Sequence, residues 1–169
     1  MAEDGKIVWV SPRVRGIIPL DERFHISHGL KKKLRKQPFE IRFDTAFREV
    51  ILGCAEREKT WIDKVILESY CHLHEQGFAH SVECWDAEGL QGGLYGVAIG
   101  KAFCGESMFS RKTDASKIAL VALVEILQER GFVILDTQWM TAHLRTFGGV
   151  EMGNEKYLEL LAGAIGLDA

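Results

Sequence analysis

Three polar side chains stand among apolar residues, at positions where they could carry out chemistry. Asp136 and Gln138 follow the apolar run at 132–135, and Glu106 lies in the sequence FCGESMFS. Because residues two apart in a strand share a face, Asp136 and Gln138 are expected to act from the same side of a sheet. A carboxylate beside an amide could orient a nucleophile or accept its proton, although the amide is not itself a usable base. The alternative is that Asp136 only caps the next helix.

The surroundings of Glu106 also indicate a binding site. A carboxylate placed among large apolar side chains costs free energy unless it has a partner. We predict a short apolar strand at 101–104, followed by a tight turn at 105–110 that carries Glu106. The alternative is an ordinary surface turn with two aromatic side chains packed beneath it.

The elements that must position these groups are predicted from the spacing of apolar residues. In the second half, the pattern indicates a hairpin, a buried helix, a buried strand and two further helices. The expected ranges are 80–85 and 90–99 for the hairpin, 114–130 for the buried helix, 132–135 for the strand, and 139–147 and 157–165 for the last helices. Glycines at 92, 93, 96 and 100 indicate a bulge, or the close approach of another backbone or a ligand.

The first half is predicted to hold shorter elements. Ser27 is expected to cap a helix at 29–36, Asp44 to cap a second helix, and Thr60 with Asp63 to form a capping box for a third. Extended segments are expected at 7–10, 17–19 and 39–43. This mixture predicts an α/β or α+β fold with a mixed sheet. Ligands of open sheets tend to lie beyond the carboxyl ends of strands, where Asp136 and Gln138 stand.

Composition limits the class of protein. The chain has 169 residues, 47 % hydrophobic and 27 % charged, which is typical of one globular domain with at most a small appendage. It has no run of eighteen apolar residues, and we expect no secretory signal, because residues 1–5 show neither a basic nor an apolar stretch. Four widely spaced cysteines favour reduced thiols and a cytoplasmic location. No metal is expected, because His72 and His74 lie on different sides of a predicted helix.

The charge of the chain is uneven. Residues 13–36 hold eight Lys and Arg against two acidic residues, a net charge of +6, whereas the whole chain has a net charge of −3. A basic segment on an acidic body indicates a polyanionic partner. The alternative is a solvated helix face without a partner.

Short sequences follow one another in a specific order along nearly the whole chain from Trp9. The most specific are HEQGFAHSVE at 74–83 and FCGESMFS at 103–110; others include GGLYG at 92–96 and LDTQ at 135–138. In this order they resemble the bacterial leucyl/phenylalanyl-tRNA–protein transferases. The resemblance implies an enzyme that moves Leu or Phe, and Met less well, from its tRNA to the N-terminal Arg or Lys of a protein, which is thereby marked for degradation. It also implies an acyl-CoA N-acyltransferase type of fold, without CoA or any other cofactor.

The same resemblance implies roles for residues at matching positions. Asp136 and Gln138 match the family's catalytic pair, and Glu106 matches its essential carboxylate. The pocket for the aminoacyl side chain is matched by Leu94, Phe103, Met108 and Leu135. The aromatic residues that flank the terminal adenosine are matched by Trp61 and Tyr70.

With this resemblance, the basic segment is expected to contact tRNA, mainly at its phosphates. The residues expected there are Arg13, Arg15, Lys31, Lys32, Lys33, Arg35 and Lys36. We expect a shortened, basic N-terminal region at 1–37 and an acyltransferase-like catalytic domain at 38–169. Family members usually have a longer region, with an aromatic residue of the active site, before the position of the sequence WVSP at 9–12.

Two other functions are open at this point. A CoA-dependent N-acetyltransferase of the same fold would need a glycine-containing pyrophosphate-binding loop before its main helix, and residues 110–115 contain no glycine. A protein that binds tRNA without catalysing transfer would show an affinity that falls steeply with salt.

Overall fold

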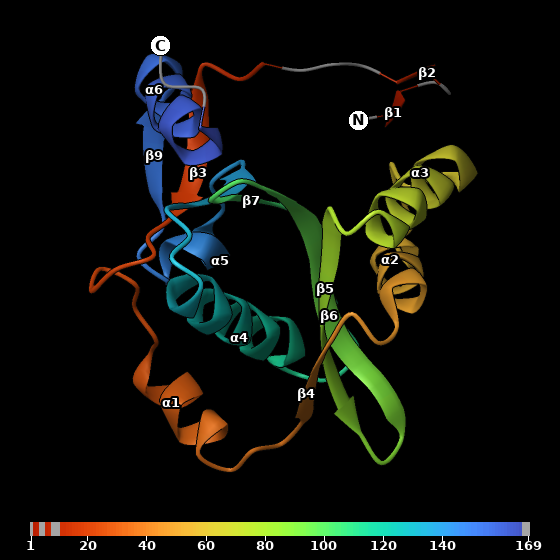
Figure 1. Cartoon of the computed structure of the whole chain (residues 1–169). Helices are drawn as coiled ribbons and strands as arrows, with labels where there is room; N and C mark the ends of the chain where they lie inside the picture. The colour runs from red at the N-terminus through yellow and green to blue at the C-terminus, as the bar shows by residue number, and fades with distance from the viewer. Residues whose placement is uncertain (1, 4–5, 8–10, 167–169) are drawn as a thin grey trace.

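A mixed β-sheet organises the molecule (Figure 1). The computed structural model describes residues 2–3, 6–7 and 11–166. The strands are β1 (Ala2–Glu3), β2 (Lys6–Ile7), β3 (Val14–Ile18), β4 (Glu40–Phe43), β5 (Ala79–Asp86), β6 (Gly89–Ile99), β7 (Ala102–Ser110), β8 (Ile134–Gln138) and β9 (Val150–Gly153). The helices are α1 (His28–Leu34), α2 (Phe47–Ala55), α3 (Lys64–Glu75), α4 (Ala115–Glu129), α5 (Ala142–Arg145) and α6 (Asn154–Ile165). Of the strand expected at 7–10, only residue 7 falls within the described residues.

Seven strands form the main sheet, in the order β4-β5-β6-β7-β8-β3-β9. Neighbouring strands are antiparallel except β7 and β8, which are parallel. The mixed sheet with flanking helices confirms the predicted α+β class. Strand β3 lies between β8 and β9, so residues 14–18 of the expected N-terminal region belong to the same sheet as the expected catalytic domain.

Helices cover both faces of this sheet (Figure 1). On one face, α4 packs in a cluster that includes Leu94 of β6. On the other face, α2 and α3 pack around Tyr95 of β6, and α6 packs through Tyr157 against the strands at the far end of the sheet. Leu94 and Tyr95 are consecutive residues and therefore belong to opposite layers. None of the described helices has the length and apolarity needed to cross a bilayer.

The stretch that carries Glu106 is a strand, and the predicted turn at 105–110 is wrong. β7 runs without interruption and pairs with β6 along its length. A partner strand overrides the local turn preference of Gly and Ser. The glycines of β6 allow close packing of other elements: a Cβ on Gly92 would lie 2.5 Å from that of Ala115 in α4, and one on Gly96 would overlap the carbonyl of Cys104.

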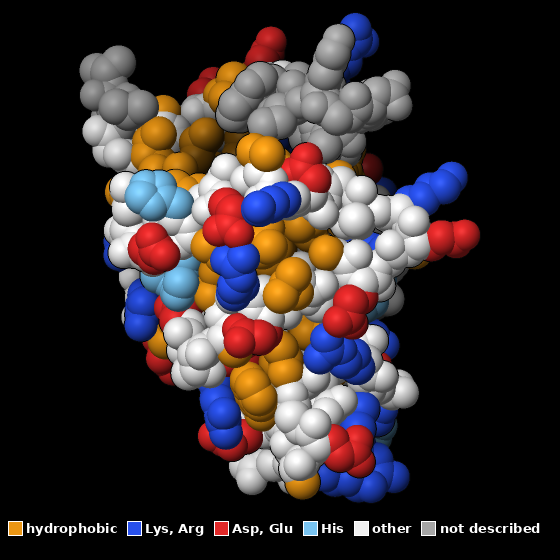
Figure 2. All heavy atoms as spheres, turned by 90° about the vertical axis from the view of Figure 1, so that its right-hand side faces the viewer, with side chains coloured by type: hydrophobic (Ala, Val, Ile, Leu, Met, Phe, Trp, Pro, Cys, Tyr) orange, Lys and Arg blue, Asp and Glu red, His pale blue; other side chains and the backbone are white. Residues whose placement is uncertain are grey.

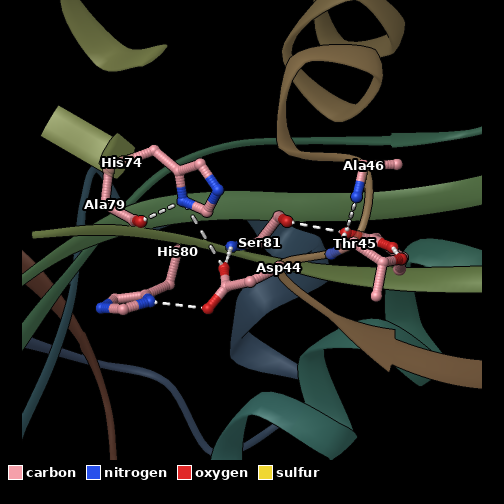
Figure 3. A network of polar contacts seen from close by, with 8 residues as sticks. Asp44, Thr45, Ala46, His74, Ala79, His80 and Ser81 are labelled. Atoms are coloured by element: carbon pink, nitrogen blue, oxygen red, sulfur yellow. Dashed lines mark hydrogen bonds and ion pairs between the residues drawn. The ribbon is translucent and has the colours of Figure 1, made fainter. Parts of the chain in front are cut away.

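Helix α2 is not capped by Asp44, contrary to the prediction. The Asp44 carboxylate accepts hydrogen bonds from the backbone N–H of Ser81 and from Nδ1 of His80, both at 2.8 Å (Figure 3). The backbone N–H groups of Thr45 and Ala46 donate instead to Glu83, at 2.9 and 2.8 Å. The sequence pattern missed this cap because the carboxylate comes from β5, far along the chain.

Of the caps predicted for the other two early helices, the one for α1 is confirmed and the one for α3 is wrong. Ser27 caps α1 as predicted, accepting a hydrogen bond from the Leu30 N–H at 3.3 Å. Helix α3 begins later than predicted, because its cap is Asp63, which accepts from the Ile66 N–H at 2.8 Å. Thr60 forms only a local turn, in which its hydroxyl accepts from the Ile62 N–H.

Candidate active site

A β-bulge in β7 places Glu106. The register of β6 and β7 changes between the pair Tyr95–Ser107 and the pair Gly96–Gly105, so Glu106 is one residue in excess on β7. A bulge bends its strand and turns a side chain away from the regular alternation. The bulge therefore sets the direction in which the Glu106 side chain points, and this direction does not follow from the alternation of a regular strand.

A second bulge lies in β8. The register of β3 and β8 changes between the pair Gly16–Gln138 and the pair Ile17–Asp136, so Thr137 is the residue in excess. The Thr137 hydroxyl donates to the Gly16 carbonyl oxygen at 3.1 Å. Gln138 has a φ of 55°, in the left-handed region that few residues other than glycine adopt. The two residues of the expected pair therefore do not follow the alternation of a regular strand.

A cavity of about 360 Å³ lies where β7 and β8 stop pairing. The parallel ladder ends at Cys104 and Asp136, although both strands continue. Its apolar lining includes residues of the α4 layer: Leu94, Met108, Leu120, Leu123, Leu135 and Leu144. Its polar lining includes Arg57, Tyr95, Glu106, Ser107, Thr137, Gln138, Thr141 and His143. The cavity thus combines an apolar wall with a set of hydrogen-bonding groups.

The surroundings of Glu106 in the cavity wall shift the pKa of its carboxyl group. Burial raises the pKa of Glu106, and the negative charge of Asp136 acts in the same direction. Tyr70 opposes these effects, because its hydroxyl stabilises the ionised carboxylate. A cationic group of a ligand would also stabilise the ionised form.

Asp136 is fully buried and lies on the face covered by α6, which differs from the expectation that it shares a site face with Gln138. Its carboxylate forms an ion pair with Arg15 of β3 and accepts a hydrogen bond from the Tyr157 hydroxyl of α6 at 2.8 Å. It also accepts a hydrogen bond from the backbone N–H of Gln138 at 2.8 Å. Asp136 and Gln138 are therefore joined by a hydrogen bond from the Gln138 backbone to the Asp136 side chain, and this bond holds Gln138 in its left-handed conformation.

The family of the chain follows from a comparison of its sequence with known families. Residues 17–162 match the family described as "Leucyl/phenylalanyl-tRNA protein transferase". The chain belongs to this family. The resemblance deduced from its short sequences is confirmed, and the chain is a transferase.

Two relatives of this transferase carry the same name, leucyl/phenylalanyl-tRNA–protein transferase. The relative from Akkermansia muciniphila is 61% identical over 166 residues, which cover 96% of this chain and 86% of the relative. The relative from Herpetosiphon aurantiacus is 54% identical over 165 residues, which cover 98% of this chain and 86% of the relative. A solved structure, "The structure of L-PGS from Bacillus licheniformis", is 16% identical with a TM-score of 0.49, over 73% of this chain and 44% of that chain.

Three of the four residues expected in the transferase's side-chain pocket line one cavity. Leu94, Met108 and Leu135 lie together in its apolar wall. Phe103 does not line it: this side chain is 2 % exposed, packs in the α4 layer and borders a second cavity of about 160 Å³.

The two aromatic residues expected beside adenosine lie in the α2–α3 layer. Tyr70 packs edge-on against Tyr95, with ring centroids 5.2 Å apart, and Trp61 is partly buried in the same cluster. Neither residue lines the cavity itself. The cluster nevertheless meets the polar part of the cavity through Tyr95.

The basic residues expected to contact tRNA divide into two groups. Arg15 points into the molecule, where it pairs with Asp136, and Lys33 pairs with Asp114 at the start of α4. The remaining five are exposed: Arg13, Lys31, Lys32, Arg35 and Lys36. The exposed group, together with the partly exposed Lys33, forms the candidate tRNA surface.

Several cavity residues have no signal in the sequence. Arg57 comes from a charged loop, yet it donates hydrogen bonds to the Ser107 hydroxyl and the Met108 carbonyl oxygen, at 2.9 and 2.7 Å. His143 reaches the cavity from the short helix α5, and burial lowers its pKa. The alternation of β6 predicts that Tyr95 lies on the other face of the sheet from Leu94. The sequence pattern does not show that the cavity is lined from both faces.

Proposed function

We propose that this transferase moves Leu or Phe, and Met less well, from aminoacyl-tRNA onto the N-terminal Arg or Lys of an acceptor protein, which marks that protein for degradation. The observation that carries the proposal is the single cavity that joins an apolar wall, suited to a Leu or Phe side chain, to the carboxylate of Glu106 and the amide of Gln138. Family membership supplies the class of reaction. We place the reaction in the cytoplasm, where charged tRNA is available.

The proposed chemistry is aminolysis of an ester. The nitrogen of the acceptor's α-amine bonds to the ester carbonyl carbon, the bond to the ribose oxygen breaks, and the proton lost by the amine ends on that oxygen. An unperturbed α-amine has a pKa of about 7.7–8, so roughly a tenth to a fifth of it is already neutral at pH 7. Because the ester is an activated donor, holding the two substrates in register accounts for most of the required acceleration.

Each group of the cavity has a proposed part in this step. Leu94, Met108 and Leu135 hold the aminoacyl side chain. The side-chain oxygen of Gln138 accepts a hydrogen bond from the attacking amine and so aims it. Asp136 acts as a positioning residue, because its carboxylate binds the Gln138 backbone N–H and is already occupied by Arg15.

The remaining groups are proposed to bind the substrates at a greater distance from the reacting atoms. The Glu106 carboxylate attracts the cationic N-terminal residue of the acceptor. Trp61 and Tyr70 flank the terminal adenosine, and the exposed Lys and Arg side chains of the N-terminal region contact tRNA phosphates. An apolar pocket separates Leu from Val by only about 1–3 kcal/mol, so rejection of polar aminoacyl groups is expected to be much stronger.

The deciding experiment incubates the protein with tRNA carrying labelled Phe and with a peptide that begins with Arg. Labelled peptide is expected, and none is expected when the peptide's α-amine is acetylated. Absence of label from the free peptide would contradict the proposal, and acetylation of the peptide by acetyl-CoA would favour a CoA-dependent enzyme.

Gln138→Glu tests the aiming role. This variant keeps the size of the side chain, adds a negative charge and should lower kcat. Undiminished turnover would remove the role proposed for the Gln138 amide.

A further inference from the structure

Three buried polar side-chain atoms have no hydrogen-bond partner among the described residues: Nε of Arg15, the hydroxyl of Tyr95 and Nε2 of His143. Such atoms are rare in native structures, and each one calls for an explanation. Two of the three residues, Tyr95 and His143, line the cavity proposed to hold the substrates. Two of the three unpaired groups therefore belong to residues that border the proposed substrate cavity.

Tyr95 is the stronger case because its whole side chain is buried. It is 0 % exposed, and its ring is held edge-on by Phe47 and Tyr70, with centroids 5.9 and 5.2 Å away. These contacts constrain the ring and therefore the direction in which the hydroxyl points. A fixed, buried hydroxyl without a partner is unfavourable in the free protein.

The position of Tyr95 connects it to the reacting groups. It pairs in register with Ser107, next to the bulge that places Glu106. The charges of Glu106 and Arg57 are close enough to influence its phenol. Burial raises the pKa of Tyr95, so the phenol stays protonated and offers a hydrogen-bond donor at every working pH.

We propose that the Tyr95 hydroxyl is a substrate-binding group that donates a hydrogen bond to a carbonyl oxygen of the bound substrate. The inference rests on the proposed function, which brings two such oxygens into the cavity: that of the aminoacyl ester and that of the acceptor's first peptide bond. Both offer the acceptor that the buried hydroxyl lacks in the free protein.

Tyr95→Phe separates this role from a structural one. Removing an unpaired buried hydroxyl should leave the melting temperature at least as high as that of the wild type, with a gain of about 2–4 °C. The same change should lower kcat/KM about 5- to 10-fold, the effect of one neutral hydrogen bond. The matched control for stability is Tyr157→Phe, which removes a hydroxyl bonded to Asp136 at 2.8 Å and should lower the melting temperature.

Binding measurements identify which carbonyl is bound. The probe is phenylalanyl-adenosine with an amide in place of the ester. If the aminoacyl carbonyl is the partner, Tyr95→Phe should bind this probe about 5- to 10-fold more weakly. If the acceptor carbonyl is the partner, probe binding should stay unchanged, and the KM for the peptide should rise by a similar factor.

Two results would overturn the inference. One is a Tyr95→Phe variant with wild-type kcat, KM and probe affinity. The other is a loss of melting temperature as large as that of Tyr157→Phe, since it would mean that the hydroxyl is already satisfied in the free protein. An inactive wild-type protein would contradict the proposed function alone, because melting temperature and the measured affinities for the probe and for the peptide would still decide the role of Tyr95.

Discussion

At the level of single residues, the ionisation of Glu106 depends on the groups that surround its carboxylate. Burial disfavours its ionised form, which is why its pKa is raised. A cationic N-terminal residue in the cavity would stabilise the ionised form and return the pKa toward the usual range. The same negative charge thus costs stability in the free transferase and contributes affinity in the complex.

We therefore expect Glu106→Gln to make the protein more stable and less active. Because the folded-state pKa is raised, ionisation of Glu106 lowers stability as the pH rises through that pKa. Thermal unfolding should show little difference from the wild type at pH 4 and a more stable variant at pH 8. The kcat/KM for a peptide beginning with Arg should fall about 10- to 100-fold, the effect of losing a hydrogen bond to a charged group. A variant less stable than the wild type at pH 8 would contradict this account.

Arg15 was predicted to contact tRNA because it is basic, but its position in the fold gives it a structural role. The sequence placed it with the tRNA contacts, whereas the structure pairs it with the buried Asp136. Breaking a buried pair leaves an uncompensated charge and costs about 3–5 kcal/mol. For a chain of this length, Arg15→Ala should lower the melting temperature by roughly 6–20 °C.

Arg13→Ala is the matched control for that prediction. Arg13 is exposed and two residues away on the same segment, so its removal should leave the melting temperature nearly unchanged. Differential scanning calorimetry checks both variants. If Arg15→Ala melts like the wild type, the ion pair with Asp136 does not contribute in solution as described.

At the level of elements, the sequence predicted several helices and strands from the spacing of apolar residues. The predictions were wrong where pairing with another strand determines the backbone geometry. The hairpin of β5 and β6 and the buried helix α4 follow directly from apolar spacing. The start of β7 was predicted, but its continuation through 105–110 was missed because Gly and Ser residues there favour a turn locally, while pairing with β6 extends them. The expectation that Asp136 and Gln138 share a face failed because a bulge at Thr137 interrupts the alternation, and a bulge depends on the register with β3.

The N-terminus of α2 gives a prediction at this scale. Glu83 is fully buried and accepts hydrogen bonds from the N–H groups of Thr45 and Ala46, and its pKa is lowered because these and other hydrogen bonds outweigh the opposing effect of burial. Its contribution is present above the unfolded-state pKa of about 4.3 and is lost as the pH falls through the lower folded-state pKa. Glu83→Gln should cost about 2–3 kcal/mol at pH 7 and progressively less toward pH 3.

Urea unfolding at a series of pH values measures this cost. Glu49→Gln is the control, because Glu49 is exposed in the first turn of the same helix and should contribute within about 0.5 kcal/mol. Equal losses in the two variants would mean that the helix only requires a nearby negative charge. A constant loss between pH 7 and pH 3 would mean that folding does not lower the pKa of Glu83.

At the level of the whole molecule, the uneven charge seen in the sequence is reduced by pairing in the structure. Arg15, Arg23 and Lys33 of the basic segment pair with Asp136, Asp21 and Asp114. On the face formed by α2 and α3, acidic and basic side chains lie next to one another (Figure 2), as in the pairs Arg48–Glu68 and Arg111–Glu56. The sequence could show the excess of positive charge, but only the folded chain shows which charges remain available to a polyanion.

Those available charges lead to a prediction about tRNA binding. Lys31, Lys32, Arg35 and Lys36 are exposed on and just after α1 and form no ion pair with another described residue. Replacing all four with Gln should raise the KM for phenylalanyl-tRNA and leave the KM for phenylalanyl-adenosine unchanged. Each lost phosphate contact should flatten the plot of log affinity against log salt by about 0.7–0.9.

The control for this experiment replaces Arg48 and Arg111 with Gln, because these residues are exposed but already paired with Glu68 and Glu56. Their replacement should leave the salt slope close to that of the wild type. If the α1 variant keeps the wild-type slope, tRNA phosphates are bound by another surface. If phenylalanyl-adenosine is also bound more weakly, the four charges act on the cavity, since this small substrate has no phosphate for them to contact.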